Sequence, residues 1–230
     1  MSDCDLFQID AFHLLGSLAD GAVDVTICDP PYDAKTHAHG VSGFRAATAQ
    51  PIDFAPFGAE DLRRFVRDAL RVSKRWVLAF CAAEQFAAYQ QAAEDFAPGS
   101  WVRGGIWVKP DPAPQFTGDR PGQWGDGIAI MHRPGKKRWN GGGHPARWTC
   151  GVERNERVHP TQKPLGLMLD PFAGSATTAL ACLRLGRRFL GSEIDPRYHA
   201  LGLERIAAER ECSTLAAHRA GQLCLLGGDR

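Results

Sequence analysis

The chain has 230 residues, of which 44% are hydrophobic, and its net charge is +1. This length fits one α/β domain over residues 1–230, and the hydrophobic content argues against wholesale disorder. No apolar run is long enough to span a membrane and no signal peptide is visible, so we expect a cytoplasmic protein. Seven dispersed cysteines without a CxxC pair indicate reduced thiols, with no disulfide framework and no metal site expected.

The alternation of apolar and polar residues predicts the elements of an α/β fold. In chain order we expect a strand at 5–9, a helix at 11–18, a strand at 22–28, a long loop at 33–56, a helix at 60–72, a strand at 76–81, a helix at 83–96, strands at 101–108 and 126–132, an irregular basic segment at 133–158, a helix at about 175–186, a strand at 188–193 and a helix at about 196–210. This alternation predicts a doubly wound, mostly parallel sheet.

The charge is distributed unevenly along the chain. Residues 101–150 carry eight Lys and Arg against three Asp, a local net charge of +5, and they hold five of the six tryptophans. Basic residues interleaved with aromatic residues are typical of a surface that binds a polyanion. Composition alone fits a solvated basic region with core tryptophans equally well, so both interpretations stay open at this point.

A strand–loop–helix motif lies in LDPFAGSATTALACLRLG, beginning at Leu169. A short apolar strand ends at Asp170, a loop of small residues follows, and a helix begins near Ser175. This arrangement is typical of nucleotide-type cofactor sites, in which glycine lets the ligand approach the backbone. The next strand ends in GSEID, which places Glu193 about 20 residues after the loop, where an acid can bind ribose hydroxyls. An ordinary carboxylate at a strand end is the alternative for Glu193.

The tetrapeptide DPPY, Asp29 to Tyr32, directly follows the apolar strand expected at 22–28. Ligands of open α/β sheets bind at the carboxyl ends of the strands, so this turn is well placed for function. Two prolines remove N–H donors and leave carbonyl acceptors, Asp29 adds a further acceptor, and Tyr32 offers a flat face. Such a set fits the exocyclic amine of a nucleic-acid base, although the same four residues could simply form a turn.

Taken together, these motifs resemble the amino-group DNA methyltransferases that use S-adenosylmethionine (SAM). Their order resembles the permuted beta group, with DPPY first, a target-recognition region at about 101–150, and then HPTQKP (159–164) and DPFAGSATT (170–178). The resemblance covers most of the chain and is strongest near the termini, in 8–32 and 188–206. It implies a circularly permuted, Rossmann-like methyltransferase fold, SAM as cofactor and double-stranded DNA as substrate.

The resemblance also implies roles for single residues. The carboxylate of Asp29 and the carbonyl of Pro30 would hydrogen-bond the amine of a flipped base and free its lone pair, with Pro31 completing the turn and Tyr32 stacking on the base. The cofactor would be bound by Asp10, Thr161, Lys163, Asp170, Phe172, Gly174, Ser175 and Glu193. Purely structural roles are the alternatives: Asp10 could cap a strand end, and Lys163 could be a solvated lysine in a turn. No cysteine nucleophile is expected.

The expected DNA contacts come from the basic, Trp-rich region. Lys136, Lys137 and Arg138 would contact phosphates, and Trp139 and Asn140 would lie near the bases. The pair His37 and His39 is expected to cover the target base. DPPY in place of SPPY favours adenine N6 over cytosine N4. An RNA substrate and a catalytically impaired DNA-binding relative stay open, as do a homodimer and a restriction endonuclease partner.

The spacing between two of the motifs is unusually short. Only LGLML separates HPTQKP from Asp170, which is too short for a helix of ordinary length. In related methyltransferases a helix and a turn lie between these motifs. A segment absent from the sequence as written, a deletion, and a wider natural spacing are the three explanations, and the first two are favoured because a missing helix would uncover an apolar sheet face. A continuous chain predicts weak SAM binding.

Overall fold

The structure, a computed structural model, describes residues 3–31, 57–110, 121–122, 125–139, 142–149, 167–212, 215 and 218. Among these residues no helix is long and apolar enough to cross a membrane. The chain divides into two compact units, each described by itself below. The first comprises Met1–Cys28, Val72–Lys74 and Val158–Arg230, and the second comprises Asp29–Arg71 and Arg75–Arg157. A single catalytic domain stays a prediction.

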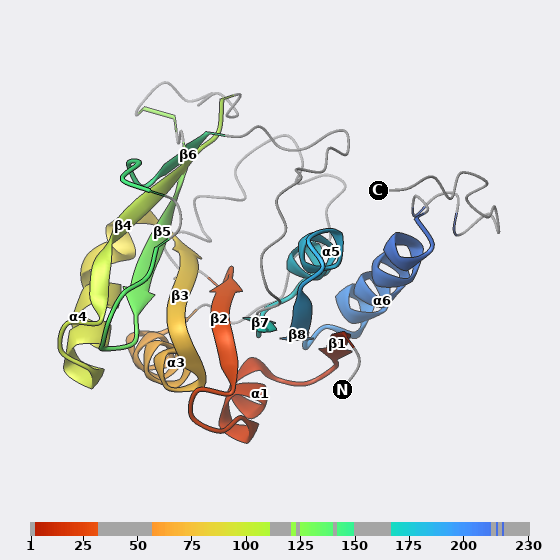
Figure 1. The fold of residues 1–230 in the computed structure, drawn as a ribbon, viewed down its shortest axis with the longest axis horizontal. Helices are drawn as coiled ribbons and strands as arrows, with labels where there is room; N and C mark the ends of the chain where they lie inside the picture. The colour runs from red at the N-terminus through yellow and green to blue at the C-terminus, as the bar shows by residue number, and fades with distance from the viewer. Residues whose placement is uncertain are drawn as a thin grey trace. The chain divides into compact units, whose positions relative to one another are not determined.

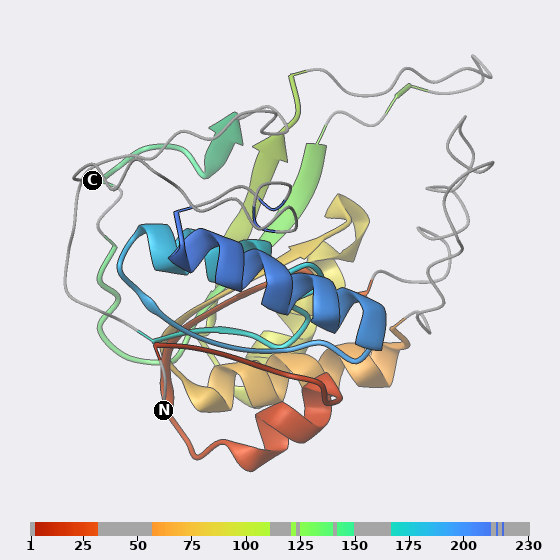
Figure 2. The same ribbon diagram turned by 90° about the vertical axis from the view of Figure 1, so that its right-hand side faces the viewer.

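The first unit contains a parallel sheet covered by helices on both sides. Its elements are β1 (Cys4–Phe7), α1 (Ala11–Ser17), β2 (Val23–Cys28), β7 (Leu167–Asp170), α5 (Thr177–Arg184), β8 (Arg188–Ser192) and α6 (Pro196–Arg210). The strands pair in the order β1-β8-β7-β2, and all three pairings are parallel. In Figure 1 α5 and α6 pack together beside β7 and β8, and Figure 2 shows α6 and α1 on opposite sides of the strands.

Small side chains let α6 approach the loop after β7 closely. A Cβ atom on Gly202 of α6 would lie 2.8 Å from Leu6 Cδ2 and 3.1 Å from the Cβ of Ala176. The apolar cluster around this contact consists of Cys4, Leu6, Ala173, Ala176, Ala179, Leu180, Cys182, Phe189 and Ile206. The core of the first unit therefore lies directly beneath the loop that the sequence singled out.

The second unit contains a mixed sheet. Its elements are α3 (Ala59–Val72), β3 (Ser73–Cys81), η1 (Ala83–Gln85), α4 (Phe86–Phe96), β4 (Trp101–Val108), β5 (Gly125–His132) and β6 (Arg147–Thr149), apart from Val72–Lys74, which are assigned to the first unit. The strands follow the order β3-β5-β4-β6, with β5 antiparallel to both β3 and β4 and β6 parallel to β4. The apolar face expected on α3 is buried, at Leu62, Phe65, Val66, Ala69 and Leu70.

The expected α/β class with a mostly parallel sheet is confirmed, and most element bounds agree within three residues. One correction concerns 133–158, which was expected to be irregular throughout. Residues 147–149 of this segment form β6, which pairs with the end of β4 in the register Trp107 to Trp148. A three-residue edge strand between glycine- and proline-rich turns has too little alternation to be recognised from sequence. The loop expected at 33–56 lies outside the described residues.

Candidate active site

The carboxyl ends of the four parallel strands of the first unit bring three predicted acids to one edge of its sheet. Asp10 follows β1, Asp170 ends β7 and Glu193 follows β8. The strand register pairs Phe7 with Ser192 and Asp170 with Gly191, so these strand ends are level with one another. Acidic side chains at adjoining strand ends of an open α/β sheet are typical of a ligand site.

The end of β2 lies at the same edge. Val25 pairs with Met168 and Thr26 with Leu169, so continuing the register places Ile27 beside Asp170. The next residue, Cys28, is the last of β2 and directly precedes DPPY in the sequence. The strand that leads into DPPY therefore ends beside the strand that leads into DPFAGS.

The loop after β7 has a fixed and unusual backbone. Gly174 and Ala176 both adopt left-handed conformations, with φ of 52° and 64°. Such a conformation is easy for glycine but strained for alanine, and Ala176 is fully buried, so packing must hold it there. The loop is also joined to β8, since the backbone N–H of Ala173 donates to the Ser192 carbonyl at 2.9 Å.

The carboxylate of Glu193 is buried and holds this loop. Its Oε2 accepts a hydrogen bond from the backbone N–H of Gly174 at 2.8 Å, and its Oε1 accepts one from the N–H of Asp195 at 2.8 Å. Only 5% of the residue is exposed. Because a carboxylate has about four acceptor sites, each oxygen can still accept one further donor. Glu193 is therefore both a structural cap and an available acceptor.

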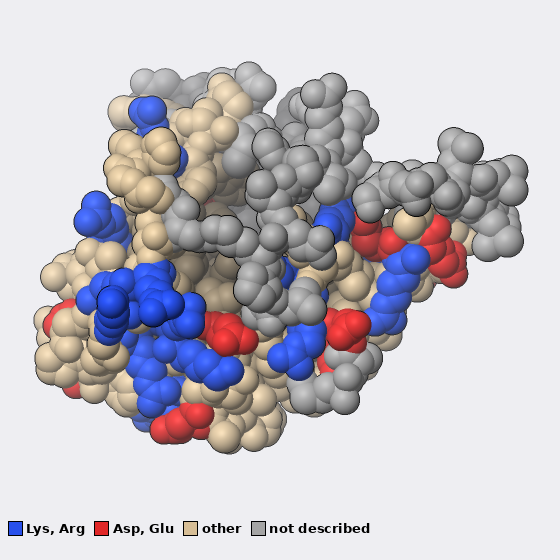
Figure 3. All heavy atoms as spheres, in the orientation of Figure 1, with Lys and Arg blue, Asp and Glu red and all other residues tan. Residues whose placement is uncertain are grey.

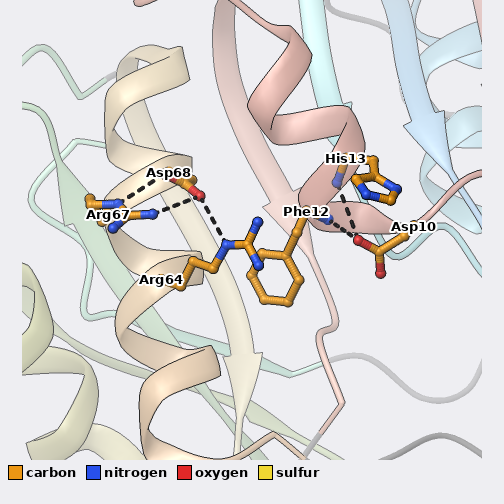
Figure 4. A network of polar contacts seen from close by, with 6 residues as sticks. All are labelled: Asp10, Phe12, His13, Arg64, Arg67 and Asp68. Atoms are coloured by element: carbon orange, nitrogen blue, oxygen red, sulfur yellow. Dashed lines mark hydrogen bonds and ion pairs between the residues drawn. The ribbon is translucent and has the colours of Figure 1, made fainter.

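Asp10 and Asp170 also bind backbone N–H groups. One oxygen of Asp10 accepts from the N–H of Phe12 at 2.9 Å and from that of His13 at 3.2 Å, and thus caps α1 (Figure 4). The other oxygen of Asp10 makes no hydrogen bond within the described part of the chain. Asp170 Oδ1 accepts from the N–H of Phe172 at 3.1 Å. Asp10 therefore has the capping role that was the structural alternative to cofactor binding. This cap leaves its second carboxylate oxygen for a ligand.

Figure 4 also shows a carboxylate network on α3 of the second unit. Asp68, which is buried, accepts from Arg67 at 3.0 Å and lies 3.8 Å from Arg64. The single carboxylate of Asp68 therefore pairs with two arginines of the same helix, and these three side chains keep a net charge of +1. The network is a structural feature of α3.

Arg205 of α6 is a candidate site residue that reasoning from the sequence did not identify. Its Nη1 donates to the Ser175 carbonyl at 2.6 Å and to the Ser175 hydroxyl at 2.7 Å. Burial lowers the pKa of the guanidinium, and the neighbouring charge of Arg184 acts in the same direction. The predicted Ser175 is thus held by a cation from α6, at a distance of 30 residues in sequence.

Three exposed apolar side chains lie at the same strand ends as the acids. Phe7, Ile9 and Ile194 are 46%, 40% and 54% exposed. Phe7 ends β1, and its carbonyl accepts from the N–H of Glu193 at 3.0 Å. Ile9 and Ile194 are the sequence neighbours of Asp10 and Glu193. Single exposed apolar residues are ordinary, but three beside a pair of carboxylates provide a surface for a flat ring. The strand pattern could have indicated them, since an exposed apolar residue after a buried strand breaks the alternation.

The first three residues of DPPY belong to the second unit. Asp29 is exposed, Pro30 is buried and Pro31 is half-buried, whereas Tyr32 lies outside the described residues. Asp29 is close enough to Cys81, the last residue of β3, to influence its thiol. Burial raises the pKa of Cys81 to about 12, and the charges of Asp29 and Asp126 act in the same direction.

Two further residues near this end of the second sheet were not predicted. Lys109 Nζ lies 2.6 Å from Asp126 Oδ2 and 5.1 Å from the ring centre of Trp107. The register pairs Gly127 with Cys81, so Asp126 lies level with the end of β3. A cation, a carboxylate and an indole therefore meet at the end where Asp29 lies.

The expected DNA contacts lie at the opposite end of β3. Trp76 donates through Nε1 to the Arg138 carbonyl at 2.9 Å, and its ring packs edge-on against Trp139 with 5.1 Å between centroids. From Trp76 to Cys81 β3 spans five residues, or about 16 Å at about 3.3 Å per residue. Lys136 and Lys137 are exposed beside Arg138 in the same turn. The structure brings these four predicted residues together but not with Asp29.

The remaining predicted site residues lie outside the described residues. They are Asn140, Thr161, Lys163 and the two histidines His37 and His39. Residues 165–166 of the short LGLML segment also lie outside the described residues. The three explanations for the length of this segment therefore stay open. The permuted order of the motifs also stays a prediction.

Comparison with known proteins identifies the class of fold first. The M1.HpyAVI–SAM complex has a TM-score of 0.59 at 23% identity, covering 88% of this chain and 99% of that chain. The cytosine-N4-specific PvuII DNA methyltransferase has a TM-score of 0.66 at 12% identity, covering 96% of this chain and 94% of that one. The fold is therefore that of the Rossmann-like methyltransferases.

Sequence comparison then confirms the family resemblance. A family model for N6/N4 methyltransferases, described as DNA methylase, matches residues 144–204, which include HPTQKP, DPFAGS and Glu193. The type II methyltransferase M2.DpnII of Streptococcus pneumoniae is 25% identical over 247 residues and is matched over 90% of each chain. This chain is thus a relative of the amino-group DNA methyltransferases. Because 247 aligned residues exceed the 230 of this chain, M2.DpnII has positions without a counterpart here.

Proposed function

We propose that this protein transfers a methyl group from SAM to the exocyclic amine of a base in double-stranded DNA, with adenine N6 as the expected target. The observation that carries the proposal is the in-register pairing of β2 with β7, which ends the strand before DPPY beside the strand before DPFAGS. An amine acceptor motif that directly follows β2 in the sequence and a cofactor-type loop that directly follows β7 suit a group transfer between two bound molecules.

The first unit offers groups that suit the parts of SAM. The free oxygen of Asp10 would accept from the adenine amino group, and the remaining acceptor sites of Glu193 would bind the ribose hydroxyls. Phe7, Ile9 and Ile194 supply apolar surface for the adenine ring. The loop from Asp170 to Ser175, together with Thr161 and Lys163, would hold the methionine end. SAM supplies an electrophilic methyl group on a sulfonium.

The chain's own contribution to the chemistry is to prepare the amine. Its lone pair is delocalised into the base, which makes the nitrogen a poor nucleophile. Acceptance of its N–H bonds by the Asp29 carboxylate and the Pro30 carbonyl draws the nitrogen toward tetrahedral geometry and frees that lone pair. Tyr32 would stack on the flipped base. Orientation and electrostatics supply the catalysis, and no covalent intermediate forms on the protein.

The choice of adenine is the finer part of the proposal. DPPY favours adenine N6, whereas cytosine N4 presents an amine of similar geometry, and a structural relative, the PvuII enzyme, is cytosine-N4-specific. Incubation of unmethylated duplex DNA with tritiated SAM, followed by digestion to nucleosides, reports both activity and base. N6-methyl-deoxyadenosine is the expected product, N4-methyl-deoxycytidine would correct the base, and absence of label with every duplex would contradict methyl transfer.

Asp29 is the residue whose substitution tests the mechanism. Asp29→Ala removes an acceptor of the amine and is expected to lower methyl transfer by about a hundredfold to a thousandfold, the range for a group that acts in the transition state. Asp95→Ala, at an exposed carboxylate on α4, is the matched control and should retain full activity. Full activity in Asp29→Ala would rule out the mechanism above.

A second candidate is a DNA-binding relative with impaired catalysis. The observation that favours it is the short LGLML spacing, together with positions of M2.DpnII that this chain lacks. Loss of a helix beside the cofactor strand would weaken SAM binding while sparing a DNA surface elsewhere. Calorimetric titration with SAM separates the two candidates, since a dead module would bind DNA and give no heat with SAM.

A further inference from the structure

A group of cations lies where β3 begins and β5 ends, and we call it the basic edge. Its members are Arg75, Arg133, Lys136, Lys137 and Arg138. The N–H of Arg133 donates to the Arg75 carbonyl at 2.8 Å, which brings the turn after β5 onto the start of β3. Figure 3 shows Lys and Arg side chains gathered over α3 and over the lower ends of β3 and β5, as these elements lie in Figure 1.

Among the described residues, no carboxylate pairs with the charged groups of the basic edge. Within the described ranges, none of its five side chains forms an ion pair with a carboxylate. The nearby carboxylate of Glu94 is already used by the N–H groups of Gly99 and Trp101, at 2.8 and 3.0 Å. These two hydrogen bonds, more than the charge of Lys137, lower the pKa of Glu94. A bound polyanion would relieve the repulsion among the cations.

Hydrogen bonds fix the turn that carries these cations, and most of the charged groups take no part in those bonds. Lys137 Nζ donates to the Gly99 carbonyl at 3.2 Å, and the Arg138 carbonyl accepts from Trp76. The side chains of Lys136 and Arg138 stay exposed. Cations on a backbone fixed in this way lose little conformational freedom when they bind phosphates.

An aromatic side chain lies beside the cations. Trp139 is 46% exposed and packs edge-on against Trp76, which packs in turn against the buried His132 with 4.5 Å between centroids. Aromatic rings next to basic side chains are typical of nucleic-acid surfaces, where they contact sugars and exposed bases. The exposed indole of Trp139 therefore rests on a ring that is itself packed against the buried His132.

The position of the basic edge limits what it can bind. It lies at the opposite end of β3 from Cys81 and Asp29, about 16 Å away along the strand at about 3.3 Å per residue. A duplex that entered at Asp29 would have to turn around the end of the sheet to reach it. Bending of a site of 20–30 base pairs by 40–90° costs about 1–6 kcal/mol. A second duplex segment needs no such bend.

We propose that the basic edge is a second nucleic-acid surface, which binds the phosphates of a duplex DNA segment other than the one at the methyl-transfer site. This proposal rests on DNA methylation as the proposed function. It changes the expected role of Lys136, Lys137 and Arg138 from contacts to the target site into contacts to a neighbouring duplex. Such a surface would keep the protein on DNA between target sites and would join two duplexes.

A bridging experiment with the full chain tests the proposal. One duplex of about 20 base pairs, short enough to resist bending, is immobilised, and capture of a second, fluorescent duplex is measured without SAM. The variant Lys136→Ala/Arg138→Ala leaves the Lys137 hydrogen bond intact and removes two exposed cations. Arg63→Ala/Arg188→Ala removes the same charge from exposed positions elsewhere and serves as the control.

Wild type and control are expected to capture the second duplex, and the basic-edge variant is expected to capture it much more weakly. Between about 50 and 200 mM salt the wild type should lose about tenfold more affinity for the second duplex than the variant does, because each phosphate contact adds about 0.9 to the salt slope. Methyl transfer to a single short duplex should stay unchanged in the variant. Trp139→Ala should weaken capture further in either background.

Three results would overturn the proposal. Capture by the basic-edge variant that equals the control would show that these cations do not bind the second duplex. A loss of methyl transfer to the single short duplex would place them at the target site instead. Preference for single-stranded RNA over duplex DNA would change the partner. Because capture is measured without SAM, a failure of methyl transfer in the wild type is a separate result.

Discussion

The carboxylate of Glu193 accepts a hydrogen bond from the backbone N–H of Gly174, with 2.8 Å between Oε2 and N. Glu193 follows β8 and Gly174 lies in the loop after β7, so one acid sets the shape of a loop that is 19 residues away in sequence. The same carboxylate is the expected ribose ligand. Binding of a ribose at Glu193 would therefore be coupled to the conformation of the loop around Gly174.

Substitution of Glu193 is expected to affect stability and cofactor binding together. Glu193→Ala leaves the N–H groups of Gly174 and Asp195 without their acceptor, and an unpaired buried donor costs about 1–3 kcal/mol. A loss of about 2 kcal/mol lowers the unfolding temperature by about 4–8 °C in a chain of this size. Calorimetry should also show SAM binding weakened by more than about tenfold, since two charged hydrogen bonds to ribose are lost.

Glu193→Gln separates the two roles of this side chain. The amide keeps one oxygen acceptor for a backbone N–H but presents an NH2 group to the other donor. We expect an unfolding temperature between those of the wild type and Glu193→Ala, with SAM binding as weak as in the alanine variant. Wild-type SAM affinity in both variants would show that Glu193 only shapes the loop.

Arg205 is predicted to be a positioning residue for Ser175. Its guanidinium holds both the carbonyl and the hydroxyl of Ser175, so Arg205→Ala should let the loop move and raise the KM for SAM by up to about thirtyfold, with a smaller effect on kcat, because two hydrogen bonds of about 1 kcal/mol each are lost. Arg205→Lys, which retains one donor, should recover part of the affinity. Steady-state kinetics at varied SAM concentration measure both constants.

The control for Arg205 is Arg63→Ala, an exposed arginine on α3 of the second unit. A change in kcat alone for Arg205→Ala would assign this residue to the transfer step. An unchanged KM would show that Ser175 keeps its position without the guanidinium.

The residues at the sheet edge could be predicted from the sequence, because buried parallel strands appear as continuous apolar runs that end in turn residues. The continuous apolar run that forms β2 and the loop after β7 placed Asp29, Asp170 and Glu193 at strand ends, and the structure brings the last two together with Asp10. Such positions follow from local sequence, since a buried strand, a turn residue and an acid are neighbours in the chain. The apolar faces of the helices were predictable for the same reason.

Contacts between distant segments could not be predicted in this way. Nothing in the local sequence of α6 indicates that Arg205 reaches Ser175, because the contact depends on how closely two helices pack. The placement of Lys136 and Arg138 at the far end of β3 depends on the antiparallel direction of β5, which composition does not reveal. A basic, Trp-rich composition predicts a polyanion surface but does not give its place on the fold.

The thiols of Cys81 and Cys182 are predicted to be unreactive at ordinary pH. Burial raises the pKa of each to about 12, and only the thiolate reacts with alkylating agents. At about pH 8.5, the usual pKa of a free thiol, iodoacetamide should label the exposed Cys212 and leave these two cysteines unlabelled in the folded protein. Peptide mass spectrometry with and without denaturant measures the pattern. Rapid labelling of Cys81 in the native protein would contradict its burial beneath Asp29.

The contact between α6 and the cofactor-type loop predicts opposite effects of the same substitution at two glycines. Gly202→Ala places a methyl group 2.8 Å from Leu6 Cδ2 and 3.1 Å from the Cβ of Ala176, which has no rotamer with which to yield. Overpacking of this kind costs about 1–3 kcal/mol, and it should displace the left-handed Ala176 and weaken SAM binding.

Gly16→Ala in α1 meets nothing within 4 Å and should stabilise the fold by about 0.5–1 kcal/mol. Thermal unfolding of both variants, with SAM titration alongside, measures the difference. Equal unfolding temperatures would show that α6 can move away from the loop at no cost, and the close packing would then not be what holds Ala176 in its strained conformation.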